Sequence, residues 1–266
     1  MANRSLLICF LCTLVSFTFF LSNTTANTLV HVHQQRSSVL SPKTILQQQS
    51  CLTQDCIASQ QTNGRKIVYL TFDDGPNPYT PQILNILQEK NTKGTFFVIG
   101  ARVTRYPQVV KRMVQEGHYL GLHSMSHDAK RLYTGNPSPL VYEMEQARKL
   151  VLATSGLNTQ LIRVPYGSMP YLKQNYRDAL VNAKFKMWDW TIDTYDWKRT
   201  NTPASVLQAV VRQANKPVEV ILMHDSYKTI QVLPKLIDYL RSQGYSLLPY
   251  NPNSHVEVNF WHDSRL

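Results

Sequence analysis

The stretch that most constrains the fold is residues 68–76, which read VYLTFDDGP. Its first half is rich in β-branched and aromatic residues, the composition of a buried strand. Its second half, around Gly75 and Pro76, is a turn signal. Binding and catalytic groups of βα units usually lie in the loop after the strand. The two adjacent carboxylates at this junction, Asp73 and Asp74, are therefore candidate functional groups.

Neighbouring carboxylates such as Asp73 and Asp74 repel each other unless positive charge lies beside them. The repulsion raises the pKa of one of them, and a metal ion or an arginine would relieve it. An alternative is that one aspartate caps the next helix while the other is solvated. The two residues alone leave both interpretations open.

From Lys66 onward, short apolar segments alternate with amphipathic helical patterns. The expected strands are at residues 68–72, 95–99, 119–122, 161–164, 185–190, 218–223 and 245–248. The expected helices begin near residue 80 and then cover about 109–116, 140–154, 171–182, 204–214 and 230–243. Repeated βα units predict an α/β fold with a mainly parallel sheet. About seven strands favour a barrel over a two-sided open sheet, although the pattern alone does not decide.

The N-terminus has the pattern of a secretory signal at residues 1–26. Arg4 precedes an apolar run over residues 6–21, and small residues follow up to Ala26. We therefore expect export to an extracellular, periplasmic or cell-wall location. The run is short for a spanning helix, so membrane association is expected only if the segment stays uncleaved.

Residues 27–65 are rich in Gln, Ser, Thr and Asn, which predicts a linker of low order. Cys51 and Cys56 lie close together within it. In an oxidising compartment they are expected to form a small disulfide loop, with two unpaired thiols as the alternative.

The chain of 266 residues is 43% hydrophobic, which suffices for one large domain. Its formal net charge of +11 is spread along the chain, with no block of five or more Lys and Arg residues. Such a surface predicts an anionic neighbourhood, for example a charged cell wall, and we expect no nucleic-acid partner. We expect a monomer.

Two histidines, His123 and His127, follow the expected strand at 119–122. One helical turn would place both imidazoles on the same face, where they can bind one ion. This spacing also occurs by chance on surface helices. One carboxylate together with this pair would make an open three-ligand site. If Asp74 is the ligand, Asp73 is left beside the bound water, where it can act as a general base.

Three further strand ends carry polar and aromatic groups, at residues 163–167, 193–197 and 222–225. Arg163 also fits a surface ion pair, and His224 also fits a structural role. Trp188 and Trp190 precede the second of these segments and suit a sugar-binding wall, but core packing is the alternative for both.

Five motifs stand in the chain in a fixed order: Thr71-Phe72-Asp73-Asp74-Gly75-Pro76, His123-Ser124-Met125-Ser126-His127, Arg163-Val164-Pro165-Tyr166, Asp193-Thr194-Tyr195-Asp196-Trp197 and Leu222-Met223-His224. With these motifs, residues 67–248 resemble the polysaccharide deacetylases of carbohydrate esterase family 4, also called the NodB-homology domain. The catalytic domain is accordingly placed at residues 66–250. Residues 251–266 are a C-terminal tail outside the resemblance.

The resemblance implies a distorted, incomplete (β/α) barrel of parallel strands, as a single catalytic domain with a groove across its top. It also implies that Asp74, His123 and His127 hold a divalent metal ion. In this family the ion is usually Zn²⁺, and in some members Co²⁺ or Ni²⁺.

The same resemblance assigns catalytic roles to residues of this chain. Asp73 would be the general base, held and kept ionised by Arg163. His224 would be the general acid, with Asp193 stabilising its protonated form. The Tyr166 backbone N–H would help bind the oxyanion.

Leu222 and Trp197 would frame a pocket for the acetyl methyl group. The implied enzyme is a polysaccharide N-deacetylase that releases acetate from an acetylated glycan. Peptidoglycan is the favoured polymer, ahead of chitin oligomers and poly-N-acetylglucosamine, and acetylxylan is less favoured.

Two other classes fit parts of the pattern. A non-catalytic wall-glycan-binding module would not need Asp73, Arg163 and His224 together. A two-histidine, one-carboxylate iron oxygenase would share the ligand set, but it usually has an antiparallel jelly roll rather than alternating βα units.

Overall fold

The computed structural model describes residues 64–266. The predicted signal, almost all of the predicted linker, and Cys51 and Cys56 lie outside the described residues. Within them, no helix combines the length and the apolar character needed to cross a membrane.

One or two helices separate consecutive strands along the described chain, except between β5 and β6, in broad agreement with the predicted βα units. The strands are β1 (Lys66–Gly75), β2 (Thr95–Val98), β3 (Tyr119–Leu122), β4 (Leu161–Ile162), β5 (Lys186–Met187), β6 (Ile192–Asp193), β7 (Val218–His224) and β8 (Tyr245–Leu247). The helices are α3 (Thr80–Glu89), α4 (Gly100–Arg105), α5 (Pro107–Gln115), α6 (Ala129–Leu132), α7 (Ser138–Ser155), α8 (Gln174–Asn182), α9 (Pro203–Gln213) and α10 (Tyr227–Ser242), with a 3₁₀ turn η1 (Pro252–Ser254).

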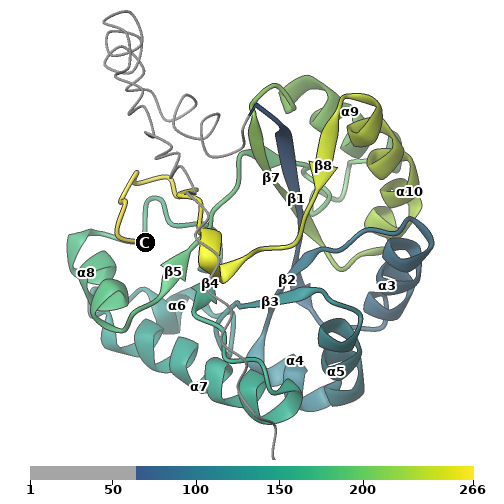
Figure 1. Ribbon diagram of the computed structural model, residues 1–266. Helices are drawn as coiled ribbons and strands as arrows, with labels where there is room; N and C mark the ends of the chain where they lie inside the picture. The colour runs from purple at the N-terminus through teal and green to yellow at the C-terminus, as the bar shows by residue number, and fades with distance from the viewer. Residues whose placement is uncertain (1–63) are drawn as a thin grey trace, which may run out of the picture. The chain divides into compact units, whose positions relative to one another are not determined.

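The strands form one parallel sheet in the order β5-β4-β3-β2-β1-β7-β6, with β8 beside the first residues of β1. The helices surround the outside of the curled sheet (Figure 1). Because every strand runs the same way, all their carboxyl ends lie at one rim, where the loops can build a site. The predicted α/β fold with a parallel, barrel-like sheet is confirmed.

The barrel is incomplete, because no ladder among the described residues joins β5 to β6. The C-terminal residues lie at this gap instead, beside β5 in Figure 1. Val258 forms a parallel bridge with Trp188, and the Trp188 indole N–H donates to the Val256 carbonyl oxygen at 2.7 Å. The segment expected to be a tail thus packs on the catalytic domain, and its last residue, Leu266, is buried.

The period-2 pattern of β1 decides which side chains reach the barrel interior. Val68, Leu70 and Phe72 face outward into the core beneath the helices. Tyr69 belongs to a second, interior cluster around Trp188. Asp73 has the same parity as Tyr69, so its carboxylate points into the barrel.

The largest local differences from the expected elements lie between residues 185 and 193. One strand was expected at 185–190, but the chain forms two short strands, β5 and β6, separated by a kink. The backbone carbonyls of Trp188 and Asp189 at this kink accept hydrogen bonds from Arg163. The kink therefore replaces strand pairing with a binding site for a buried guanidinium.

Candidate active site

A cavity of about 410 Å³ opens at the rim formed by the strand ends. It is lined by Asp73, Asp74, His123, His127, Val164, Tyr166, Gly167, Trp190, Asp193, Trp197, Leu222 and His224. All the predicted site residues except Arg163 line this cavity, and Arg163 lies fully buried beneath Asp73. The structure thus brings together residues from five distant stretches of the chain.

Asp74 lies between two imidazoles. Its Oδ1 atom is 3.5 Å from His123 Nε2 and 3.4 Å from His127 Nε2. Ligand atoms bound about 2.1 Å from a tetrahedral ion lie about 3.4 Å apart. Asp74 Oδ1 is also buried without a hydrogen-bond partner among the described residues, as expected for an atom that needs a cation. This donor set fits a divalent ion of the zinc type.

The charge states of these groups suit ligation. Burial raises the pKa of Asp74, but the two histidines, His224 and Arg102 outweigh it, so this pKa lies below its usual value. Burial lowers the pKa of His127, with a further contribution from His123. The site therefore offers an ionised carboxylate and neutral imidazole, the forms that bind metal.

His123 is fixed in one tautomer by a contact behind the site. Its Nδ1 lies 2.6 Å from the Arg163 carbonyl oxygen, which can only accept a hydrogen bond. Nδ1 therefore carries the proton, and the lone pair of Nε2 faces Asp74.

The spacing of the two histidines had suggested that they share a helical turn, but they do not. Residues 123–128 form a loop in which Ser124 (φ 63°) and His127 (φ 57°) are left-handed. Buried Glu143 of α7 accepts hydrogen bonds from the backbone N–H groups of Met125 and Ser126, at 3.1 and 2.9 Å. The imidazoles converge because this loop is pinned, and not through helical periodicity.

Asp73 is held by the buried guanidinium of Arg163, with Nη1 2.8 Å from Oδ1. The same Nη1 donates to Thr71 Oγ1 at 2.7 Å, and the ring of Phe97 lies 4.1 Å below the guanidinium. The arrangement aims the other carboxylate oxygen of Asp73 at the cavity, 3.8 Å from His123 Nε2.

His224 is held by Asp196, whereas the sequence had suggested Asp193. Asp196 Oδ1 lies 2.7 Å from His224 Nδ1, and Oδ2 accepts from the His224 backbone N–H at 2.7 Å. Burial lowers the pKa of His224, but the hydrogen bond and charge of Asp196, with the charges of Asp73 and Asp74, raise it to about 9. The ring nitrogen left for the cavity, Nε2, therefore carries a proton near neutral pH.

Asp193 instead organises the cavity wall. Its Oδ1 accepts from the Tyr195 backbone N–H at 2.8 Å and from the Trp197 indole N–H at 3.4 Å. Tyr195, between the two aspartates, is left-handed (φ 55°), and the carboxylate of Asp196, three residues after Asp193, faces His224. No periodicity of the sequence predicts which of the two carboxylates takes this position.

Two tryptophans that the sequence could not separate have different roles. Trp188 is fully buried in the interior cluster. Trp190 lines the cavity with Trp197, which is 55% exposed. Val164 and Gly167 were not among the predicted site residues, whereas Trp190 had been considered for a sugar-binding wall.

Comparison with known proteins places these features in a family. Residues 60–188 match the model of the polysaccharide deacetylase family. The chain is 44% identical over 217 residues to a peptidoglycan-N-acetylglucosamine deacetylase of Bacillus cereus, covering 79% of each chain. It is 33% identical to a chitooligosaccharide deacetylase of Sinorhizobium fredii, covering 71% of this chain and 93% of the other.

A solved structure shows the same fold. The crystal structure of a polysaccharide deacetylase from Bacillus cereus matches with a TM-score of 0.73 at 44% identity, covering 76% of this chain and all of that one. Because identity and coverage are both high, the chain belongs to the polysaccharide deacetylases, hydrolases that act on the N-acetyl groups of polysaccharides.

Proposed function

We propose that this protein hydrolyses N-acetyl groups of an N-acetylglucosamine-containing polysaccharide in a metal-dependent reaction that releases acetate. The observation that carries the proposal is the buried, unpartnered Asp74 oxygen between His123 and His127, with Asp73 and His224 in the same cavity. A glycan-binding module would have no use for an acid, a base and an ion site together.

Asp74, His123 and His127 would hold the ion, with Zn²⁺ as the first choice and Co²⁺ or Ni²⁺ as alternatives. Bound there, the ion would polarise the acetamide carbonyl and lower the pKa of water.

Asp73 acts as the general base. It accepts the proton of the water whose oxygen attacks the carbonyl carbon, and Arg163 holds the carboxylate in position during the step. The developing negative charge on the carbonyl oxygen is stabilised by the Tyr166 backbone N–H.

His224 acts as the general acid. Its Nε2 donates a proton to the nitrogen as the C–N bond breaks, and Asp196 stabilises the imidazolium before that transfer. The water supplies OH to the carbonyl carbon and H to the amine, so acetate and a free amino sugar result.

Several features support peptidoglycan as the substrate. The relative with 44% identity is named for it, and the net charge of +11 suits an anionic wall. Chitin oligomers are the second candidate, because another relative is named for chitooligosaccharides. Poly-N-acetylglucosamine stays a third. Export by the segment at residues 1–26 and a monomeric state belong to the same proposal.

The test is acetate release by the purified, zinc-loaded protein from peptidoglycan, chitin oligomers, poly-N-acetylglucosamine and acetylxylan. We expect the highest kcat/KM on peptidoglycan and the lowest on acetylxylan. Binding to glycans without acetate release from any of them would refute catalysis and support the binding-module alternative.

A further inference from the structure

Asp189 is a buried carboxylate that the proposed mechanism does not use. It is fully inaccessible, at the kink between β5 and β6. Its Oδ1 accepts from the Ser168 backbone N–H at 2.9 Å, and its Oδ2 accepts from the Ser168 hydroxyl at 2.6 Å. Ser168 lies two residues after Tyr166, so Asp189 anchors the loop that carries the proposed oxyanion donor.

The same carboxylate also anchors the C-terminal residues. Asp189 Oδ2 accepts from the Phe260 backbone N–H at 2.8 Å, and the Asp189 N–H donates to the Val258 carbonyl oxygen at 2.6 Å. The indole N–H of Trp261 donates to the Ser168 carbonyl oxygen at 3.1 Å. Asp189 therefore connects the loop that carries Tyr166 to residues 258–261, which lie beyond residues 60–188 matched by the family model.

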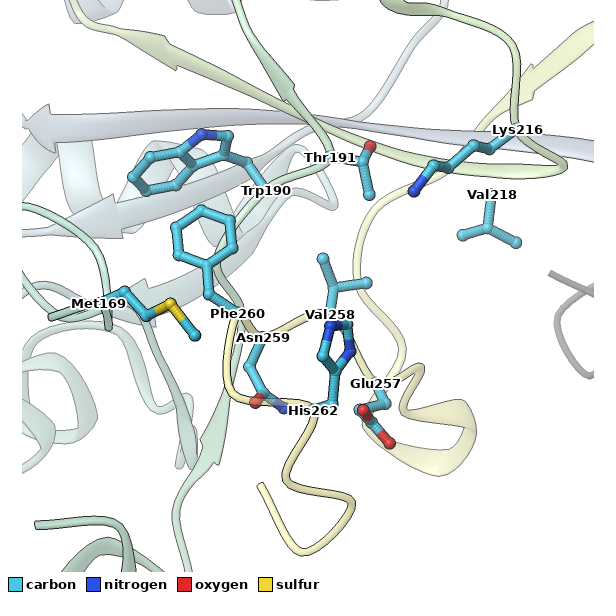
Figure 2. Close-up of a pocket in the computed structure, with 10 residues that line it drawn as sticks. All are labelled: Met169, Trp190, Thr191, Lys216, Val218, Glu257, Val258, Asn259, Phe260 and His262. Atoms are coloured by element: carbon cyan, nitrogen blue, oxygen red, sulfur yellow. The ribbon is translucent and has the colours of Figure 1, made fainter. Parts of the chain in front are cut away.

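Aromatic packing connects the C-terminal residues to Trp190, which lines the cavity. The rings of Phe260 and Trp190 meet edge to face with centroids 5.0 Å apart. Figure 2 shows the two side chains next to each other. A Cβ atom on Gly167 would lie 2.9 Å from Trp190 and 3.3 Å from Phe260. The backbone of the loop thus rests directly against rings that the C-terminal segment holds in place.

The loop needs such support because its backbone is strained. Tyr166 has φ 69°, a left-handed conformation that costs a non-glycine residue about 1–3 kcal/mol. Tyr166 is 53% exposed, and its side chain is held at one side, by a hydrogen bond from its hydroxyl to the His127 carbonyl oxygen at 3.1 Å and by ring contact with His127. Strain of this kind persists only where surrounding contacts fix the chain.

We propose that Asp189, together with C-terminal residues 256–261, is a positioning element that holds the Tyr166 backbone N–H toward the reacting carbonyl. The inference rests on the proposed function. It adds that residues 256–261 are needed for the full rate of the chemical step.

The informative variant is Asp189→Asn, which keeps the shape of the side chain. An asparagine has one acceptor oxygen where the carboxylate has two. If that oxygen faces the Ser168 N–H, the side-chain NH₂ group faces the Phe260 N–H, and two donors then meet. In the reverse orientation, the NH₂ group faces the Ser168 N–H instead. One of the two anchors is lost in either orientation.

Loss of one oxyanion donor costs about 100- to 1,000-fold in kcat, so a displaced donor should cost about tenfold or more. We expect that loss in kcat of Asp189→Asn with unchanged KM and unchanged zinc affinity. A glycan carrying a methylphosphonamidate in place of the acetamide mimics the tetrahedral oxyanion. Its affinity should fall by the same factor as kcat/KM, because only transition-state binding is affected.

The matched control is Asp263→Asn, which removes ion pairs to Arg177 and Arg265 in the same C-terminal segment but does not touch Ser168. It should lower the melting temperature and leave kcat unchanged. Ser168→Ala loses only the hydrogen bond from the Ser168 hydroxyl to Asp189 and should show a smaller loss in kcat. This variant replaces Asp189→Asn as the test if Asp189→Asn does not fold.

Wild-type kcat and wild-type analogue affinity in both Asp189→Asn and Ser168→Ala would overturn the inference. So would a crystal structure of Asp189→Asn in which Tyr166 kept its left-handed conformation and its N–H direction. The crystallographic readout does not depend on activity. A wild-type protein that released no acetate would instead refute the proposed function.

Discussion

Asp73 and His224 are direct register partners in the parallel ladder between β1 and β7. Their neighbours Phe72 and Met223, also paired, face outward into the helix-side core. Because side chains alternate along a strand, Asp73 and His224 both point into the cavity. The sheet itself therefore sets the spacing between the proposed base and the proposed acid, and Asp74 at the end of β1 forms the ion site with the loop that carries His123 and His127.

Asp73→Asn should nearly abolish acetate release while the metal stays bound. The amide keeps the shape and the contact with Arg163, but it cannot accept the proton of water. General-base catalysis contributes about 100- to 10,000-fold, and we expect a loss of kcat in that range. Acetate release and metal content, measured on the same sample, check the prediction. Ordinary turnover in this variant would exclude Asp73 as the base.

Asp196→Asn should shift the pH dependence of activity much more than Asp193→Asn does. His224 must be protonated to donate, and its raised pKa of about 9 places the loss of activity on the alkaline side. A bound cation would offset the negative charge of Asp74, which would lower the pKa of His224 and move the loss of activity to a somewhat lower pH. Removing the Asp196 carboxylate lowers the pKa of His224, so activity should be lost at a pH at least about one unit lower.

The measurement is the pH profile of kcat for the wild type and both variants. Asp193 is the matched control, because it bonds Tyr195 and Trp197 and not His224. A shift of the alkaline limb in Asp193→Asn, with none in Asp196→Asn, would reverse the assignment.

Glu143→Ala should weaken zinc binding by about tenfold, in the range found for groups that orient metal ligands. The buried Oε2 atom of Glu143 accepts two backbone N–H groups of the His123–His127 loop and the Ser126 hydroxyl, and alanine has no side-chain acceptor for any of them. Competition titration with a chelator measures the affinity. Glu145→Ala on the same helix, which removes only a partly exposed ion pair with Arg148, should bind zinc as the wild type does. Equal affinities in all three proteins would show that the loop needs no such anchor.

Gly121→Ala should destabilise the fold by about 2 kcal/mol, the usual cost of overpacking a core. The added Cβ would lie within 2.5 Å of the Phe97 ring, which is fully buried and lies under the Arg163 guanidinium. Denaturant unfolding measures the free energy of unfolding. Val211→Ala, at an exposed position of α9, is a control expected to change this free energy by about 0.5 kcal/mol or less. An unfolding free energy for Gly121→Ala equal to that of the wild type would mean that Phe97 can move aside.

Much of this architecture could be predicted from sequence because it depends on local pattern. The apolar runs predict the strands, and their ends predict where Asp73, His123, Arg163 and His224 gather. Parallel strands place those ends at one rim whatever the exact register. The family motifs then add roles that no pattern of burial could supply.

The remaining features depend on the path of the chain between the strands. The choice of Asp196 over Asp193 follows from a turn of three residues, and the convergence of His127 follows from left-handed residues in a loop. The closure of the barrel gap by Val258 and Phe260 rests on contacts with residues about 70 positions earlier, such as Asp189. Local propensity carries no information on such contacts.

The central claim is tested most directly by acetate release from peptidoglycan before and after metal removal. The account predicts that protein stripped with a chelator releases no acetate and that stoichiometric zinc restores release. It also predicts that Asp74→Ala, treated identically, gains nothing from zinc at that concentration. Equal acetate release by the stripped and the zinc-loaded wild-type protein would contradict the account.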